Sequence, residues 1–276
     1  MFIRNIKRFP IFIKRSFAME SKVSVCKIHF GDRKINFLKI GEGPRVVLCL
    51  PGVLGTIWTD FNRQVEHLNK SQLTLVCMDM PGCGGSRPPD CTFPSSFYHM
   101  NAEYAANLMK VSNPLPLSIM GWSDGGISGL ILASQYPENV ASLVVWGANA
   151  HVTSNDVKLY EGIQDIDNWS PKMAEPFLAV YGREVLKKGM HEWYDRICQI
   201  QKEGGDICKN DLAKIKAPTL IVHGDKDPVV PLEHAEFLKE KISNSTLVRF
   251  PNGKHNLHLR FYEEFNNLVE NFFKEH

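Results

Sequence analysis

Short apolar runs alternate with segments of helical spacing along most of the chain. The runs span residues 45–50, 73–78, 116–121, 140–146, 219–222 and 246–250. Helical patterns span residues 60–68, 102–111, 127–135 and 232–242, with a terminal amphipathic pattern from 257. Continuous apolar runs of this length are typical of strands buried on both faces, as in parallel sheets. Residues 22–40 instead alternate apolar and polar positions, which predicts a hairpin. The whole pattern favours a mostly parallel, doubly wound α/β domain.

One segment interrupts this alternation. Residues 150–210 are rich in Trp, Tyr, Lys and Glu and have helical spacing without a strand-like run. We expect a helical cap insertion over the C-terminal edge of the sheet, so that residues 20–276 form one domain. The cap, together with Trp58, Trp122 and Trp146, could wall an apolar pocket, although each of these aromatic side chains fits the core equally well.

The first 19 residues differ from the rest. They hold five basic residues and no acidic one, with Phe2, Ile6, Phe9, Ile13 and Phe17 at helical spacing. An acid-free, amphipathic, Arg-bearing N-terminus is typical of a mitochondrial transit peptide, so we predict a mitochondrial location. Pro10 and the scarcity of hydroxyl residues keep two alternatives open, a disordered basic leader or translation from Met19, which would favour the cytoplasm.

Composition narrows the functional classes. The net charge is only +2 and the tail alone carries five cations, so the body is mildly acidic, which argues against a nucleic-acid-binding surface. No run approaches the ~20 apolar residues of a membrane span. The seven cysteines form no C-x-x-C pair, which favours reduced intracellular thiols and no metal site.

A G-x-S-x-G motif follows the apolar run at 116–121. It reads Gly-Trp-Ser-Asp-Gly at residues 121–125, and a helical pattern comes directly after it. A sharp turn between strand and helix lifts its serine above the sheet in a strained backbone conformation. The sequence therefore predicts Ser123 as a nucleophile.

A serine nucleophile needs a base and an acid that orients the base. In folds with this turn, the acid and then the histidine follow later strands. Asp225 and Asp227 both come after the run at 219–222. We favour Asp227, which lies further out and can reach a histidine, whereas Asp225 abuts the strand end and suits an Asx turn.

The base should follow the next strand. His255 lies in the loop after the run at 246–250, whereas His258 already belongs to the terminal helical pattern, so we predict His255. His223 lies inside a strand end and is expected to be structural.

The oxyanion of the reaction needs two backbone N–H donors. One should be the amide of Asp124, directly after the nucleophile. The other should come from the loop Pro-Gly-Val-Leu-Gly at 51–55, where we choose the Val53 N–H. An ordinary Pro-Gly turn is the alternative for this loop.

With these residues identified, the chain resembles the α/β-hydrolases over residues 22–276, and more narrowly the biphenyl hydrolase-like family, the valacyclovir hydrolases. The matching stretches are 50–52, 54–55, 121–126, 146–150, 160–163, 223–231 and 253–261. The resemblance implies a mitochondrial serine hydrolase that cleaves α-amino-acid esters, including amino-acid ester prodrugs, without a metal or organic cofactor. It also implies a triad of Ser123, Asp227 and His255.

Asp124 adds a constraint on the substrate. Two like charges ~4 Å apart cost about 4 kcal/mol at an effective dielectric near 20, so a carboxylate here opposes the oxyanion. A substrate α-ammonium would offset that repulsion. A first-turn helical aspartate also gains roughly 0.3–1 kcal/mol from the helix dipole, which is the structural alternative. The resemblance assigns this position to the α-amino group, so we expect a small ester with a free α-amine.

The sequence argues against carbon–carbon hydrolysis, because the carbon–carbon hydrolases related to this family carry Met after the nucleophile and an aromatic residue after the histidine, whereas this chain has Asp124 and Asn256. A thioester or thiolactone hydrolase, or an acyltransferase, would use the same triad. A non-catalytic ligand-binding module on this scaffold is a third reading. We expect a monomer that has no membrane span and does not bind nucleic acid.

Overall fold

The computed structural model describes residues 7–8, 24–112 and 116–276. The predicted transit segment lies outside these ranges, apart from the two-residue strand β1 (Lys7–Arg8), which pairs antiparallel with β2. None of the helices in the described ranges combines the length and apolar character that a bilayer crossing requires.

The described strands form one sheet in the order β1-β2-β3-β5-β4-β6-β7-β8-β9. Their bounds are β2 (Ser24–Phe30), β3 (Arg33–Ile40), β4 (Arg45–Leu50), β5 (Leu73–Met78), β6 (Leu117–Trp122), β7 (Val140–Trp146), β8 (Thr219–Gly224) and β9 (Ser245–Phe250). Strands β2 and β3 form the predicted hairpin, and β3 pairs antiparallel with β5. All pairings from β5 through β9 are parallel. The predicted doubly wound sheet is confirmed.

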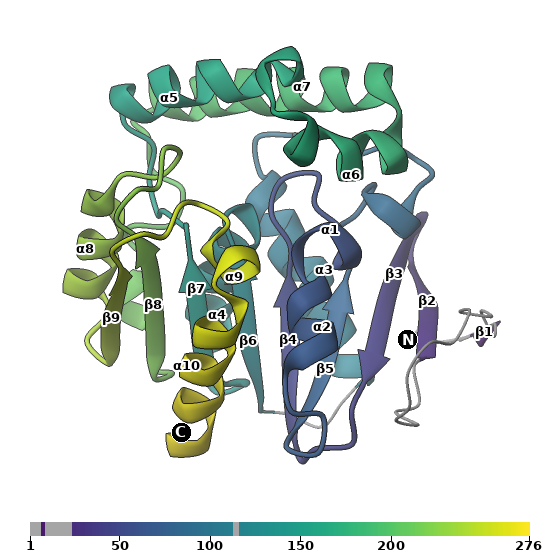
Figure 1. The fold of residues 1–276 in the computed structure, drawn as a ribbon, viewed down its shortest axis with the longest axis vertical. Coiled ribbons are helices and arrows are strands. Elements are labelled where there is room, and N and C mark those ends of the chain that lie inside the picture. The colour runs from purple at the N-terminus through teal and green to yellow at the C-terminus, as the bar shows by residue number, and fades with distance from the viewer. Residues whose placement is uncertain (1–6, 9–23, 113–115) are drawn as a thin grey trace.

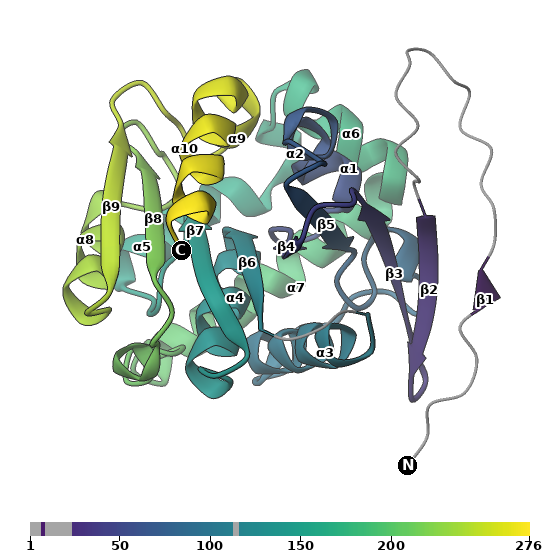
Figure 2. The same ribbon diagram turned by 90° about the horizontal axis from the view of Figure 1, so that it is seen from below.

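Helices cover both faces of this sheet (Figures 1 and 2). One face carries α1 (Ile57–Asp60), α2 (Asn62–His67), α9 (Leu257–Arg260) and α10 (Tyr262–Glu275). The other carries α3 (Phe97–Ser112), α4 (Asp124–Gln135) and α8 (Leu232–Lys241). Alternate strand side chains therefore enter two cores, with Val47 of β4 in one and Leu48 in the other.

The cap insertion is helical, as predicted. It comprises α5 (Ser154–Gln164), α6 (Pro171–Tyr181) and α7 (Arg183–Lys202), and Figure 1 shows them across one end of the sheet. The chain enters and leaves the cap side by side, because the Val152 amide donates to the Gly205 carbonyl at 2.7 Å. Short 3₁₀ turns at 84–86, 166–168 and 212–214 complete the described elements.

A buried histidine–carboxylate contact fastens the cap to the domain. His234 of α8 lies 3.0 Å from both carboxylate oxygens of Asp156, and neither side chain is exposed. Asp156 also caps the start of α5 through Thr153. Burial raises the pKa of Asp156, but bonds from His234 and Thr153 outweigh it and hold this pKa below its usual value. The first cap helix is thus tied to α8.

Two predicted helices are each broken by a phenylalanine. The helical pattern at 60–68 divides at Phe61, which has non-helical φ −121° and ψ 9°. Its fully buried ring packs edge-on against Trp146. The terminal pattern from 257 likewise divides at Phe261, between α9 and α10. We attribute the break at Phe61 to burial of the ring, which the periodicity alone does not reveal.

Candidate active site

The turn between β6 and α4 holds Ser123 in a rare conformation. Its φ is +53° and ψ −124°, although it is not a glycine. Strand and helix can meet this closely because small residues surround the turn. A Cβ on Gly125 would lie 2.0 Å from the Leu50 carbonyl oxygen, and one on Gly121 would lie 2.5 Å from the Gly125 carbonyl oxygen. The strained turn expected at the G-x-S-x-G motif is present.

His255 and Asp227 meet at the same end of the sheet. The imidazole Nδ1 of His255 lies 2.9 Å from Asp227 Oδ2. The other carboxylate oxygen accepts hydrogen bonds from the amides of Val229 and Val230 at 2.8 and 3.0 Å. Burial alone would raise the pKa of Asp227, but His255 and these donors hold it below its usual value. The carboxylate is therefore fixed in its ionised form and orients the imidazole.

The rival residues have other partners. Asp225 forms an ion pair with Arg249 at the surface, at 2.7 Å. His258 is fully buried and donates through Nε2 to the Asp60 carbonyl, and burial lowers the pKa of His258 to about 3. His223 lies buried within β8, where burial lowers its pKa. Neither histidine shares the contact that joins His255 to Asp227.

A narrow cavity beneath the cap brings the predicted residues together. Ser123, His255, Val53 and Asp124 all line it, and its volume is ≈ 80 Å³. The cap contributes an apolar roof of Tyr160, Ile163, Trp169, Met173, Phe177 and Trp193. Ser123 and His255 thus line one space, and His255 is joined to Asp227 through Nδ1.

The three tryptophans proposed for the pocket have different positions. Trp122 lines the cavity and donates through Nε1 to the His255 carbonyl at 2.9 Å. Trp146 is 1% exposed and belongs to the core on the α10 face. Trp58 is 48% exposed, which neither alternative anticipated. The walls come instead from Trp122 and the cap.

The loop at 51–55 is anchored by a carboxylate that the sequence did not reveal. Asp60 Oδ2 accepts the Gly52 N–H at 2.9 Å, and a Cβ on Gly55 would collide with that carboxylate. Burial raises the pKa of Asp60 to about 7. The spacing of apolar residues places Asp60 only at the start of a helical pattern. The loop is therefore held rigidly, with Val53 at the cavity wall.

Asp124 is buried at the first residue of α4. Its Oδ1 accepts the Tyr98 hydroxyl at 3.0 Å, and its Oδ2 accepts Trp193 Nε1 at 2.9 Å. Burial raises its pKa to about 7, against the opposing effect of these two donors. No ion pair of the described residues includes Asp124. Sequence reasoning missed both donors, since they lie 26 and 69 residues away.

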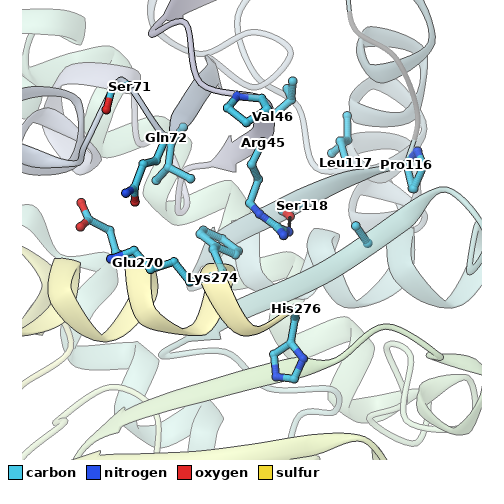
Figure 3. A pocket seen from close by; sticks show the side chains of 14 residues that line it. Arg45, Val46, Ser71, Gln72, Pro116, Leu117, Ser118, Glu270, Lys274 and His276 are labelled. Carbon is cyan, nitrogen blue, oxygen red and sulfur yellow. Dashed lines mark hydrogen bonds between the residues drawn. The ribbon is translucent and has the colours of Figure 1, made fainter.

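A larger cavity lies at the opposite edge of the sheet (Figure 3). It measures ≈ 760 Å³ and is lined by the first residues of β4, β5 and β6 and by the end of α10. There Arg45 donates to the Ser118 hydroxyl at 3.1 Å and lies over the Phe273 ring. None of the predicted site residues lines it. Sites in such sheets form at the carboxyl ends of the strands, so the smaller cavity is the candidate.

Within the described ranges, no set of three or more His, Cys, Asp and Glu side chains could hold a metal ion. The chemistry available at the cavity under the cap is that of a hydroxyl, an imidazole–carboxylate pair, backbone amides and one buried carboxylate.

Comparison with known proteins agrees with this architecture. The family model for the alpha/beta hydrolase fold matches residues 45–180 and 181–261. A serine hydrolase BPHL from Mus musculus is 47% identical over 253 residues, covering 91% of this chain and 85% of that protein. The Homo sapiens protein of the same name is 43% identical over 256 residues, covering 92% and 88%.

Solved structures agree on the fold. A serine hydrolase involved in carbazole degradation superimposes with a TM-score of 0.75 at 22% identity, covering 92% of this chain and all of that one. At this identity the likeness concerns the fold alone. The family model and the two BPHL relatives therefore show that the chain belongs to the α/β-hydrolase family and, within it, to the biphenyl hydrolase-like serine hydrolases.

Proposed function

We propose that this serine hydrolase cleaves α-amino-acid esters through an acyl-enzyme on Ser123. His255 takes the Ser123 proton as the hydroxyl attacks the ester carbonyl, while Asp227 stabilises the imidazolium that forms. The alcohol leaves with that proton, and water then releases the amino acid by the reverse sequence. The 2.9 Å contact between His255 and Asp227 supports this assignment.

Two backbone amides are suited to the oxyanion. Asp124 is the first residue of α4, and the first N–H groups of a helix have no partner within it. The first bond of this helix comes only from the Ile127 amide to the Ser123 carbonyl. The Val53 amide belongs to the loop that Asp60 anchors, so both donors are preorganised.

The uncompensated charge of Asp124 carries the substrate assignment. Its carboxylate is buried beside the nucleophile and lines the cavity. Among the described residues, its only hydrogen-bond donors are the neutral Tyr98 hydroxyl and Trp193 indole. A buried carboxylate without a cation is costly. A substrate α-ammonium would supply that cation and remove the repulsion that Asp124 exerts on the oxyanion.

Labelling tests the nucleophile. A fluorophosphonate probe should modify Ser123 in the folded wild-type protein, and Ser123→Ala should abolish both labelling and ester turnover. Unlabelled Ser123 in folded, pure protein would favour the non-catalytic ligand-binding alternative.

A substrate panel tests the ester class. Matched esters, amides and thiolactones, each with and without a free α-amine, are compared by kcat/KM on the wild-type protein. Truncating a buried charge pair costs about 2–5 kcal/mol, so the amine should raise kcat/KM for esters by at least roughly 30-fold. Equal rates for both members of each ester pair would contradict the proposal. A higher rate on amine-bearing thiolactones than on esters would assign the thiolactonase alternative instead.

We also propose that residues 1–19 direct the protein to mitochondria and that the mature enzyme is a monomer. The acid-free basic N-terminus supports the first proposal. Sequencing the N-terminus of protein recovered from mitochondria should find a start beyond these residues, and sedimentation should give a single species near the monomer mass. An intact N-terminus in cytosolic protein, or a stable dimer, would contradict them.

A further inference from the structure

The Asp124 carboxylate joins the cap to the rest of the domain. Tyr98 approaches it from α3, which packs on the sheet, and Trp193 approaches it from α7, which belongs to the cap. Each donor takes a different carboxylate oxygen. The orientation of the carboxylate is therefore set jointly by two elements that are almost 100 residues apart in the chain.

Both donors hold the carboxylate without neutralising it. An indole N–H donates and does not titrate, and burial raises the pKa of Tyr98 well above its ordinary value, so it stays a phenol. A carboxylate offers about four lone-pair positions, and these two bonds use one on each oxygen. One position on each oxygen is left for a further donor, and Asp124 lines the cavity.

Packing fixes the two donors themselves. Tyr98 is 3% and Trp193 4% exposed. The Tyr98 ring lies 3.8 Å from that of Phe97, and the Trp193 ring lies 5.2 Å from that of Tyr160, centroid to centroid. Side chains locked in this way hold a polar group in one geometry, which a recognition site requires.

We propose that Tyr98 and Trp193 are positioning residues that make Asp124 selective for a substrate α-ammonium, and that recognition of the amine therefore depends on the seated cap. The inference rests on the proposed function. It adds that selectivity is built from three side chains of three elements. A cap that shifts away from the core would withdraw the Trp193 donor and weaken amine recognition before it disturbs Ser123.

Three conservative variants test the proposal. Trp193→Phe and Tyr98→Phe each remove one donor and keep an aromatic ring. Trp169→Phe is the matched control, because Trp169 also roofs the cavity from the cap but donates to the Ile163 carbonyl instead. The measurement is kcat/KM for an ester with a free α-amine and for its analogue without the amine, with folding checked by circular dichroism.

The ratio of the two kcat/KM values should fall roughly tenfold in each donor variant, as expected for one hydrogen bond to a charged group. The loss should lie mainly in KM, since binding of the amine is weakened. In Trp169→Phe, kcat/KM should change by the same factor for both substrates, so that their ratio stays as in the wild type. An unchanged ratio in both donor variants, or an equal fall in Trp169→Phe, would overturn the inference.

The pH dependence separates positioning from a merely structural role. The two donors favour the ionised form of Asp124, so removing either donor should raise the pKa of this carboxyl. The acid limb, the pH range in which the ratio of the two kcat/KM values falls as the pH drops, should then move to higher pH. A structural defect would lower kcat/KM for both substrates without moving the acid limb of their ratio. Asp124→Asn distinguishes the two levels of the proposal: if it leaves the ratio unchanged, Asp124 does not bind the amine, and the role given to Asp124 in the proposed function fails. If it abolishes the ratio while the donor variants keep both ratio and limb, only the further inference fails.

Discussion

At the scale of residues, the site places groups in states that cost stability. Ser123 adopts a positive φ, and a non-glycine residue in such a region costs of order 1–3 kcal/mol. Asp124 and Asp60 are buried carboxyls whose pKa values burial raises to about 7. Each of these residues lies at the cavity or at the loop that borders it. Strain and buried charge are thus concentrated where the chemistry is proposed.

The raised pKa of Asp124 predicts a bell-shaped selectivity. Only ionised Asp124 binds an ammonium, so the advantage of the amine should fall as the pH drops through about 7. It should fall again above roughly 8, where a free α-amine loses its proton. The measurement is the ratio of kcat/KM with and without the amine from pH 5 to 9. A ratio that is flat across this range would show that the Asp124 carboxylate does not bind the charged α-ammonium of the substrate.

At the scale of elements, the close meeting of β4 and α4 sets the position of the nucleophile. The first turn of α4 lies against the end of β4, with no room for a side chain at Gly125. Helix α5 of the cap is different. Gly162 there has open space around it and an ordinary φ. The two glycines provide matched tests of what each element needs.

Gly125→Ala should destabilise the protein strongly, because its Cβ would lie 2.0 and 2.4 Å from the carbonyl oxygens of Leu50 and Pro51. Overpacking of this kind costs about 1–3 kcal/mol or more. Gly162→Ala should stabilise by about 0.5–1 kcal/mol, since alanine is the better helix former. Urea unfolding measures both. A neutral Gly125→Ala would mean that the turn between β6 and α4 has room for a methyl group.

At the scale of the whole molecule, the sequence predicts most of what surrounds the site. The apolar runs give β4, β5 and β7 with their observed bounds, because strands buried on both faces leave an unbroken pattern. The cap and the contact between His255 and Asp227 follow from the order of strands along the chain. Parallel strands bring their carboxyl ends to one edge, so residues far apart in sequence can be placed together.

The unpredicted parts depend on contacts without a local pattern. Trp193 is identified as a partner of Asp124 only by the way the cap sits on the core. Asp60 falls within a helical pattern, and nothing in its spacing reveals that it accepts the Gly52 amide. Burial of Trp146 and exposure of Trp58 are likewise decided by tertiary packing. Periodicity finds elements, whereas these roles require knowing which elements meet.

The buried carboxyls also predict how stability depends on pH. Asp124 has a pKa near 7 when folded and roughly 4 when unfolded, so the folded state binds the extra proton between these values. The free energy of unfolding should therefore fall as the pH rises from about 4 to 7, by up to about 1.4 kcal/mol per pH unit for each such group. Asp60 contributes with the same sign.

Asp124→Asn should flatten this slope and make the protein more stable than wild type at pH 8. Asp225→Asn is the control, because Asp225 lies in a surface ion pair with Arg249 that is worth little. Urea unfolding at pH 5, 6, 7 and 8 measures the slopes. A variant with the wild-type slope would mean that Asp124 is ionised throughout.

The central claim is that the Asp124 carboxylate, beside the nucleophile, binds the positively charged α-ammonium of the substrate. Four kcat/KM values test it most directly, those of the wild type and Asp124→Asn on one ester with a free α-amine and on its analogue without the amine. We predict a coupling of about 2 kcal/mol or more, which means that the substitution slows the amine-bearing ester at least roughly 30-fold more than its analogue. Equal losses on the two esters, and hence no coupling, would contradict the account.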